Sequence, residues 1–235
     1  MEIKDIFLTG GSGTLGSQMI LDSAEYNIKF TSPSSDDCDI RVGWQVDENI
    51  KNFKGDTVVH CAAFTDVKAA EKYPLLAAHI NVLGTFNVLQ ACIKYKKRLV
   101  YISTDYVFDG KKGNYKTYDS INPLSNYAKT KAAAELLVRT YDNSLVIRTS
   151  FYGKKFPYEK ALVDQWTSKD YVDVISPLVT GCIIKHQTGI IHVGSPKSTV
   201  YEIAKRRSKS VIPISMQDLE IEIPRDTSLH VDEVF

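Results

Sequence analysis

Short apolar segments alternate with longer segments of helical periodicity along the first 150 residues of the chain. The apolar segments are Ile3–Leu8, Tyr26–Thr31, Asp56–His60, Leu99–Ile102 and Leu145–Arg148. Short runs of this kind are typical of strands that are buried on both faces. Because helical segments separate them, they predict an α/β fold with a doubly wound parallel sheet.

Net charge, hydropathy and cysteine content narrow the class of protein. The chain carries 29 basic and 28 acidic residues, a net charge of +1, so it has no overall field that would attract nucleic acid. No uninterrupted apolar run approaches ~18 residues, and the first residues lack a signal-peptide pattern, so we expect no membrane association. The 4 cysteines are scattered, and neither they nor the histidines show metal-ligand spacing. We therefore expect reduced thiols, a cytoplasmic location and no metal site.

The first predicted strand runs directly into the glycine turn Thr9–Gly16, and helical spacing follows from Leu15 to Ala24. Glycines stand at every third position of this turn: Gly10, Gly13 and Gly16. Without side chains there, the backbone can approach a pyrophosphate, and the N–H groups of the helix can point at it. Glycine turns also serve as plain connections, but the position after an N-terminal strand favours dinucleotide binding.

The second predicted strand ends in serines. A site that prefers NAD usually has an Asp or Glu at this position, which accepts hydrogen bonds from the ribose. Ser32 stands there instead and leaves room for a 2′-phosphate, although the nearest cations are Lys29 and Arg41. We therefore expect NADPH in preference to NADH. Asp36 and Asp37 are either ribose contacts or solvated loop residues.

Small residues, Cys61-Ala62-Ala63, follow the third predicted strand. They lie at the edge of the sheet where doubly wound folds bind ligands, and their size admits a cofactor. We expect His60, inside a valine-rich strand, to be a packed core residue and not a catalytic group. Asn81 lies among apolar residues of a predicted helix. If buried it needs partners, and these could be a backbone bulge or a water instead of a ligand.

A tyrosine and a lysine stand four residues apart near the start of another predicted helix. Pro123 and Ser125 can open this helix, and four-residue spacing puts Tyr127 and Lys131 on one face. A nearby cation favours phenolate, which would move the pKa of Tyr127 towards the range useful for proton transfer. The alternative is a solvated helix with an unrelated Tyr and Lys.

Several motifs, in their order and spacing, resemble those of the extended short-chain dehydrogenase/reductase superfamily. They are the glycine turn, Cys61-Ala62-Ala63, Asn81-Val82-x-Gly84-Thr85, Ser103-Thr104-Asp105-Tyr106-Val107-Phe108, Tyr127-x-x-x-Lys131 and Ile147-Arg148-Thr149-Ser150. The motif that begins at Ser103, followed by those that begin at Tyr127 and Ile147, is most similar to the dTDP-4-dehydrorhamnose reductase family of sugar-nucleotide reductases. The resemblance implies a Rossmann-type domain at residues 1–150 and a short substrate-binding region, packed on it, at residues 151–235.

The resemblance also implies roles for the matching positions. The cofactor-binding residues would be Gly10, Ser12, Gly13, Thr14, Leu15, Gly16, Ser32, Asp39, Ile40, Cys61, Ala62, Ala63, Thr65, Asn81, Ser103, Tyr127 and Lys131. The catalytic residues would be Thr104, Tyr127 and Lys131, and the substrate side would be formed by Thr104, Asp105, Val107, Asn126 and Phe151. Thr104 would donate a hydrogen bond to the substrate carbonyl, although a hydroxyl at a strand end can also simply cap a turn.

The implied function is reduction of a nucleotide-linked 4-keto sugar by NADPH or NADH, with Tyr127 as general acid. The alternatives are an epimerase or dehydratase of the same superfamily, or a non-catalytic subunit that keeps the cofactor site. The intact Thr104, Tyr127 and Lys131 favour an enzyme, and a single acid, Asp105, after the threonine favours reduction over dehydration. The C-terminal region is shorter than is common in the family, and Lys154, Lys155 and Lys160 there are either diphosphate contacts or solvated charges. The sequence leaves a homodimer open.

Overall fold

The computed structural model describes residues 4–219 and 223–231 of the chain. Its central sheet contains β1 (Lys4–Thr9), β2 (Ile28–Thr31), β3 (Thr57–His60), β4 (Arg98–Thr104), β5 (Ser144–Thr149) and β10 (Gly189–Val193). The strand order is β10-β5-β4-β3-β1-β2, and each neighbouring pair is parallel. The predicted parallel, doubly wound sheet is confirmed, and the five strands expected from the sequence each begin and end within two residues of their predicted bounds.

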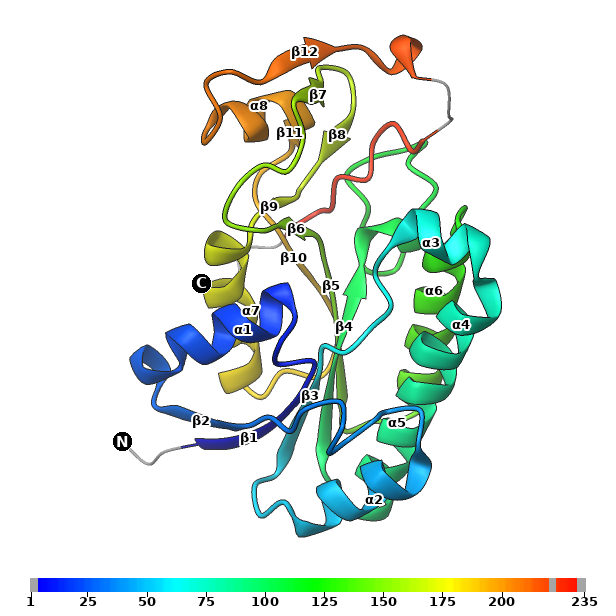
Figure 1. Cartoon of the computed structure of the whole chain (residues 1–235), viewed down its shortest axis with the longest axis vertical. Coiled ribbons are helices and arrows are strands. Elements are labelled where there is room, and N and C mark those ends of the chain that lie inside the picture. The colour runs from blue at the N-terminus through cyan, green and yellow to red at the C-terminus, as the bar shows by residue number, and fades with distance from the viewer. Residues whose placement is uncertain (1–3, 220–222, 232–235) are drawn as a thin grey trace.

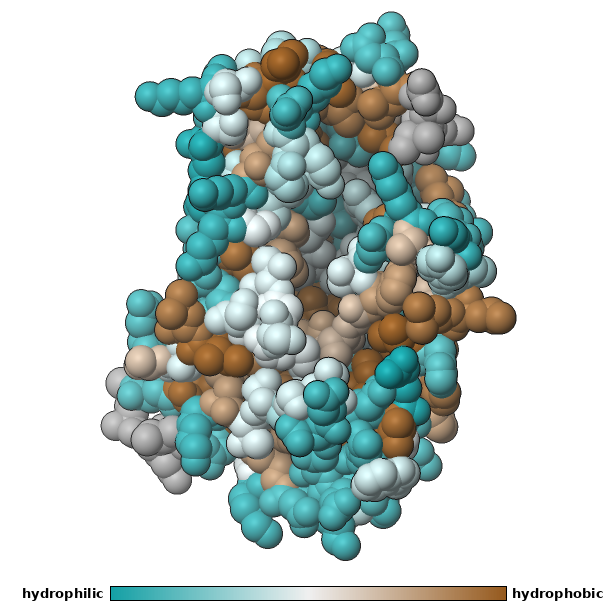
Figure 2. Space-filling view, in the orientation of Figure 1, coloured by the Kyte–Doolittle hydropathy of each residue, from teal (hydrophilic) through white to brown (hydrophobic). Residues whose placement is uncertain are grey.

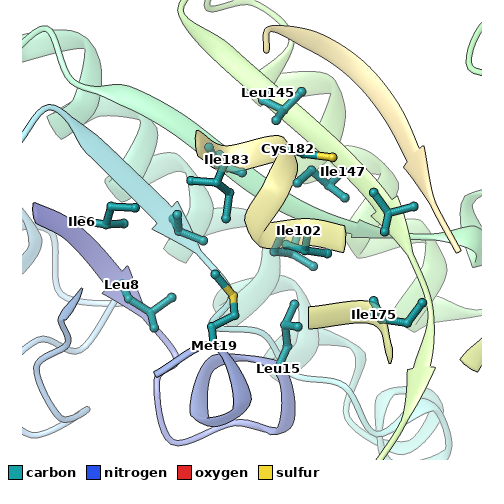
Figure 3. Packing of buried hydrophobic residues seen from close by; sticks show 14 of the residues in the cluster. Ile6, Leu8, Leu15, Met19, Ile102, Leu145, Ile147, Ile175, Cys182 and Ile183 are labelled. Carbon is teal, nitrogen blue, oxygen red and sulfur yellow. The ribbon is translucent and has the colours of Figure 1, made fainter. Parts of the chain in front are cut away.

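Helices cover both faces of this sheet (Figure 1). One face carries α1 (Thr14–Asp22) and α7 (Val172–Ile184), and the other carries α2 (Gly43–Asn52), α5 (Gly84–Lys94) and α6 (Asn126–Val138). Each face buries its own apolar cluster. In the first cluster, Leu15 and Met19 of α1 lie with Ile175 of α7 against strand residues such as Leu8 and Ile102 (Figure 3). Burial on both faces explains why the strands are apolar throughout.

The sheet and its helical layers continue beyond residue 150. Strand β10 pairs with β5, with Ile191 opposite Ile147, and α7 packs on the same face as α1. A domain boundary at residue 150 would therefore separate β10 from the sheet that it extends and α7 from the sheet face that it covers. That division stays a prediction.

The remaining C-terminal elements gather above the carboxyl ends of the strands, at the top of Figure 1. They are β6 (Phe151–Tyr152), β7 (Lys160–Leu162), β8 (Trp166–Thr167), β9 (Asp170–Tyr171), β11 (Ser198–Thr199), α8 (Val200–Lys205), β12 (Ile212–Ile214) and the 3-10 turn η4 (Met216–Asp218). They pair as β6 with β9, β7 with β12 and β8 with β11. A small apolar cluster of their own, which includes Leu162 and Ala204, holds part of this region together.

The helical run before α5 is interrupted. After the short helix α3 (Val67–Lys72), the chain forms α4 (Pro74–Ala78) and the π-helical turn η2 (His79–Leu83), which leads into α5. The whole run, Pro74–Lys94, is long and apolar enough to cross a membrane by length and composition, with a mean hydropathy of 1.4. The run was not expected from the sequence because polar residues such as His79, Asn81 and Asn87 interrupt it. The inner face of α5 carries Val88 and Leu89 into the core, whereas Leu75, Phe86 and Ile93 are exposed.

Asn81 occupies the π-helical turn and holds backbone instead of ligand. Its side-chain oxygen accepts from the amide of Phe64 at 2.7 Å, and its nitrogen donates to the Phe64 carbonyl at 3.1 Å and to Thr130 Oγ1 at 2.9 Å. The side chain is 1% exposed. A buried amide therefore has all its partners within the protein, as expected for the backbone-bulge interpretation.

Candidate functional site

A cavity of about 890 Å³ lies at the carboxyl ends of the central strands. We call it the ligand cavity. It lies beside β1, whose neighbours in the sheet are β2 on one side and β3 on the other. Doubly wound sheets bind ligands where the strand order reverses in this way. Figure 2 shows a depression near the middle of this face, below the C-terminal elements. The predicted site residues that line the cavity are Gly10, Ser12, Gly13, Thr14, Leu15, Gly16, Asp39, Ile40, Cys61, Ala62, Ala63, Thr65, Ser103, Thr104, Tyr127, Lys131 and Phe151.

Five predicted site residues, all in the described part of the chain, do not line this cavity: Ser32, Asn81, Asp105, Val107 and Asn126. Val107 is fully buried in an apolar cluster with Phe108. The amide side chain of Asn126 donates to Glu71 at 2.8 Å. Asp105 is buried and accepts from Thr227 Oγ1 at 2.9 Å. Asp105 and Val107 lie behind the cavity wall, because the turn after β4 directs them inward, whereas Asn126 begins α6 and is partly exposed.

The glycine turn approaches the neighbouring backbone too closely for side chains. Gly10 has a φ of +74°, and a Cβ there would lie 2.5 Å from the Ala62 nitrogen. A Cβ on Gly16 would lie 2.4 Å from the Gly10 carbonyl oxygen. Gly13 is the N-cap of α1 and supplies no capping side chain. The first amides of α1 are therefore available to an anion such as a pyrophosphate.

The opposite end of the ligand cavity, near the loop after β2, contains a cation that sequence analysis treated as distant. Arg41 lines the cavity together with Ser35 and Asp36. Its guanidinium pairs with Asp39 at 2.6 Å. This hydrogen bond lowers the pKa of Asp39. The lining of this cavity therefore includes a guanidinium, paired with Asp39, and the hydroxyl of Ser35, which are groups that can bind a phosphate.

Helix α6 brings Tyr127 and Lys131 to the cavity. Ser125 is its N-cap and accepts from the Ala128 amide at 3.2 Å, as the sequence predicts. The ammonium of Lys131 donates to the Ile102 carbonyl oxygen at 2.6 Å and lies 4.1 Å from the centre of the Tyr101 ring. Burial lowers the pKa of Lys131 to about 7, although Cys61 and Glu135 oppose the shift. Lys131 therefore loses much of its charge near neutral pH.

Tyr127 keeps its proton at neutral pH, which differs from the lowered pKa expected from sequence. Burial raises its pKa to about 12, and the neighbouring Asp105 adds to the shift, while a hydrogen bond with Thr104 and the charge of Lys169 oppose it. Lys131 is not among the groups that lower this pKa, and burial brings its own pKa to about 7. A protonated phenol that faces a cavity is a proton donor.

Thr104 both caps a turn and lines the cavity. Its hydroxyl accepts from the Tyr106 amide at 3.2 Å, which begins the 3-10 turn η3 (Asp105–Val107). It also donates to Asp105 Oδ1 at 3.2 Å. Burial raises the pKa of Asp105. Both interpretations of the strand-end hydroxyl therefore apply to the same group.

A buried ion pair supports this end of the sheet from behind. Arg148 on β5 and Glu135 on α6 are 1% and 0% exposed, and Nη2 of the arginine lies 2.6 Å from Oε1 of the glutamate. Ser103 donates to Glu135 at 2.7 Å, and Arg148 donates to the Thr117 carbonyl at 3.1 Å. Glu135 lies four residues after Lys131, as Lys131 does after Tyr127. This spacing could have predicted that Glu135 shares their helix face.

Lys169 is a cavity residue that sequence analysis missed. It lies between β8 and β9 and lines the ligand cavity with Tyr106 and Tyr158. Its ammonium is 4.7 Å from the centre of the Tyr152 ring and 5.6 Å from that of Tyr106. The three lysines considered from the sequence, all of them described, do not line the cavity: Lys154, Lys155 and Lys160.

His60 is a core residue, as predicted. Its ring is 1% exposed, with Nδ1 2.6 Å from Thr9 Oγ1 and Nε2 3.0 Å from Thr85 Oγ1. The Thr85 hydroxyl donates to the Asn81 carbonyl at 2.6 Å, so its oxygen accepts from Nε2. The neutral ring therefore uses both nitrogens, and burial lowers its pKa to about 3.

Acidification from about pH 7 to about pH 5 is expected to lower the free energy of unfolding by about 2 kcal/mol through His60. The unfolded ring binds a proton below its usual pKa of 6.5, whereas the folded ring does so only near 3. Stability is therefore lost as the pH falls between these values. Urea unfolding at both pH values should show a smaller pH dependence for His60→Gln. The exposed His79→Gln is the control, and an unchanged pH dependence in His60→Gln would contradict the assignment.

Comparison with known proteins identifies the family. The chain matches the RmlD substrate binding domain family over residues 4–177. The dTDP-4-dehydrorhamnose reductase of Aggregatibacter actinomycetemcomitans is 32% identical over 185 residues, which are 75% of this chain and 62% of that protein. Methionine adenosyltransferase 2 subunit beta of Bos taurus is 30% identical over 142 residues, 57% of this chain and 42% of that protein. The chain spans about three fifths of the length of the first of these relatives.

Solved structures show the same fold over nearly the whole chain. The dTDP-4-dehydrorhamnose reductase of Bacillus anthracis, determined in complex with NADP, has a TM-score of 0.88 at 26% identity and covers 99% of this chain and 92% of its own. The UDP-glucose 4-epimerase of Thermus thermophilus has a TM-score of 0.73 at 20% identity and shares the fold; it covers 94% of this chain and 90% of its own. The chain therefore belongs to the RmlD substrate binding domain family, an extended short-chain dehydrogenase/reductase family that resembles dTDP-4-dehydrorhamnose reductase.

Proposed function

We propose that this protein is an NADPH-dependent reductase of a nucleotide-linked 4-keto sugar. The observation that carries the proposal is the meeting of three groups on one cavity: the glycine turn, the hydroxyls of Thr104 and Tyr127, and Lys131. The glycine turn leaves space for a pyrophosphate, and side chains at these glycines would fill that space. The Bacillus anthracis relative, determined with NADP, supports the choice of cofactor.

In this proposal the residues of the chain bind, orient and donate a proton. A bound reduced nicotinamide supplies the hydride. Thr104 turns its single hydroxyl proton from Asp105 to the substrate carbonyl, and Tyr127, protonated at neutral pH, gives its proton to the carbonyl oxygen. Lys131 holds the ribose next to the nicotinamide. Phe151, which also lines the cavity, contacts the sugar.

The position of Asp105 favours reduction over dehydration. An acid that eliminates water must reach the sugar, and in the described structure the Asp105 carboxylate is held by Thr227 and Thr104 and does not line the cavity. The deciding experiment is oxidation of NADPH by the purified protein with a panel of nucleotide-linked 4-keto sugars. We expect turnover with at least one of them. No turnover across the panel, with intact cofactor binding, would instead support a non-catalytic subunit.

Arg41→Ala is expected to lower NADPH affinity by about tenfold, or about 1.4 kcal/mol, and to leave NADH affinity nearly unchanged. The guanidinium lines the cavity beside Ser35, where only the phosphorylated cofactor adds negative charge. Titration of both cofactors, followed by nicotinamide fluorescence, measures the effect. Lys29→Ala is the matched control, since Lys29 does not line the cavity in the described structure. An equal loss for both cofactors would show that Arg41 acts only by holding Asp39.

A further inference from the structure

Lys169 lines the ligand cavity, and no described residue accepts a hydrogen bond from its ammonium. Among the described residues, the aromatic faces of Tyr152 and Tyr106 are its close neighbours, and no hydrogen bond joins its Nζ to an acceptor. An ammonium has three N–H donors. An aromatic ring face attracts the positive charge but does not replace a hydrogen-bond acceptor. The N–H groups of Lys169 are therefore available to a group that binds in the cavity.

Lys169 keeps its positive charge. Burial disfavours the charged form, but the surrounding Tyr106, Tyr152 and Asp105 outweigh it and raise the pKa of Lys169 above its ordinary value. Lys131 behaves differently, because burial lowers its pKa to about 7. At neutral pH, Lys169 is therefore the more fully charged of these two cations.

Lys169 also lies close to the phenol that is proposed to donate the proton. Both side chains contact the ring of Tyr106: the Lys169 ammonium lies 5.6 Å from its centre, and the Tyr127 ring is T-shaped to it with 6.4 Å between centres. The ammonium of Lys131, one helical turn along α6 from Tyr127, donates to the Ile102 carbonyl. Tyr127 therefore has one cation committed to the backbone and one, Lys169, whose donors are not used by described residues.

We propose that Lys169 is an electrostatic partner of Tyr127 that stabilises the negative charge formed when this tyrosine gives up its proton. The inference rests on the proposed function. In that reaction a hydride moves from the reduced nicotinamide to the carbonyl carbon, and the carbonyl π electrons move to oxygen. The O–H bond of Tyr127 breaks, its proton joins that oxygen, and water later returns a proton to the phenolate. Lys169 stays protonated throughout.

The geometry favours this role over binding of the substrate diphosphate. In a nucleotide-linked hexose the diphosphate is attached at C1, whereas the ketone is at C4, on the opposite side of the ring. A ketone within reach of Tyr127 therefore places the diphosphate away from this tyrosine. Lys169 acts on Tyr127 and on Asp105, which both belong to the reacting end.

The test is the pH dependence of the reverse reaction, oxidation of the 4-hydroxy sugar nucleotide by NADP⁺. This direction needs the phenolate, so its rate rises with pH as Tyr127 ionises. Since the pKa of Tyr127 is about 12, kcat is compared below that pH, where it increases with the phenolate fraction. Lys169→Met is expected to lower kcat about tenfold at each pH, which displaces the profile by about one unit to higher pH, with little change in KM. Lys169→Arg should restore both values. Lys154→Met, a change at a lysine outside the cavity lining, is the matched control.

An unmoved pH profile with a raised KM would overturn the proposal and identify Lys169 as a diphosphate contact. If Lys169→Met does not fold, Lys169→Gln takes its place. If the wild type is inactive across the substrate panel, the proposed function fails separately from this inference. Ultraviolet difference titration of phenolate, with Tyr127→Phe subtracted, then tests the electrostatic pairing directly, and it should show Tyr127 ionising at higher pH in Lys169→Met. An unchanged titration would contradict the pairing.

Discussion

Replacing Tyr127 with phenylalanine is expected to lower ketone reduction by about 10²- to 10⁴-fold while cofactor affinity changes little. The substitution removes one hydroxyl and keeps the ring, so the edge contact with Tyr106 and the packing of α6 remain. The alkoxide formed by hydride transfer, however, loses its proton donor. Single-turnover oxidation of NADPH and fluorescence titration of the cofactor measure the two quantities separately.

Lys131→Ala is the informative companion to that variant. Its ammonium is proposed to hold the nicotinamide ribose, so its loss should weaken cofactor binding as well as turnover. It also removes the hydrogen bond to the Ile102 carbonyl, so thermal unfolding of both variants must be recorded. Wild-type turnover in Tyr127→Phe would show that another group is the acid.

Glu135→Gln is expected to lower the free energy of unfolding by about 3 to 5 kcal/mol. It leaves the guanidinium of Arg148 charged and 1% exposed, without the carboxylate that Nη2 contacts at 2.6 Å. An arginine cannot escape by losing its proton. Urea unfolding of the wild type and the variant, under the same conditions, measures the loss.

Two further variants separate the buried pair from ordinary surface charge. Arg139 lies 3.9 Å from Glu135 with a side chain that is 42% exposed, so Arg139→Ala should cost no more than about 1 kcal/mol. The double variant Glu135→Gln, Arg148→Met should recover part of the loss, because no buried charge remains unpaired. A loss below about 1 kcal/mol in Glu135→Gln would mean that water or the Thr117 carbonyl compensates Arg148.

The first five strands were predictable because each is a local apolar run bounded by a glycine, small or polar residue. Strand β10 was not predicted, although Gly189–Val193 contains three aliphatic residues. Its place beside β5 depends on a connection of about forty residues that returns the chain to the sheet. Local periodicity does not contain that information.

The cofactor side of the cavity was more predictable than the substrate side. Residues such as Gly10 and Ala62 follow directly from strand ends, and the carboxyl edge of a parallel sheet places them together. Asp105 and Val107 lie in a 3-10 turn, where neighbouring side chains point in different directions. The sequence does not show which of them points to the cavity and which to the core. Lys169 lies in a segment without helical or strand periodicity, and only its pairing neighbours bring it to the cavity.

The single amide of Asn81 has a mechanical consequence for the entry of ligands. It clamps the loop at Phe64, after β3, to Thr130 of α6, so this loop and the helix that carries Tyr127 are joined as one rigid wall. Parting the loop from the helix breaks either the buried bond to Thr130 or the two part-buried bonds to Phe64. We therefore expect the ligand cavity to widen at another part of its lining, where Phe151, Tyr158 and Lys169 lie on short strands and connecting segments.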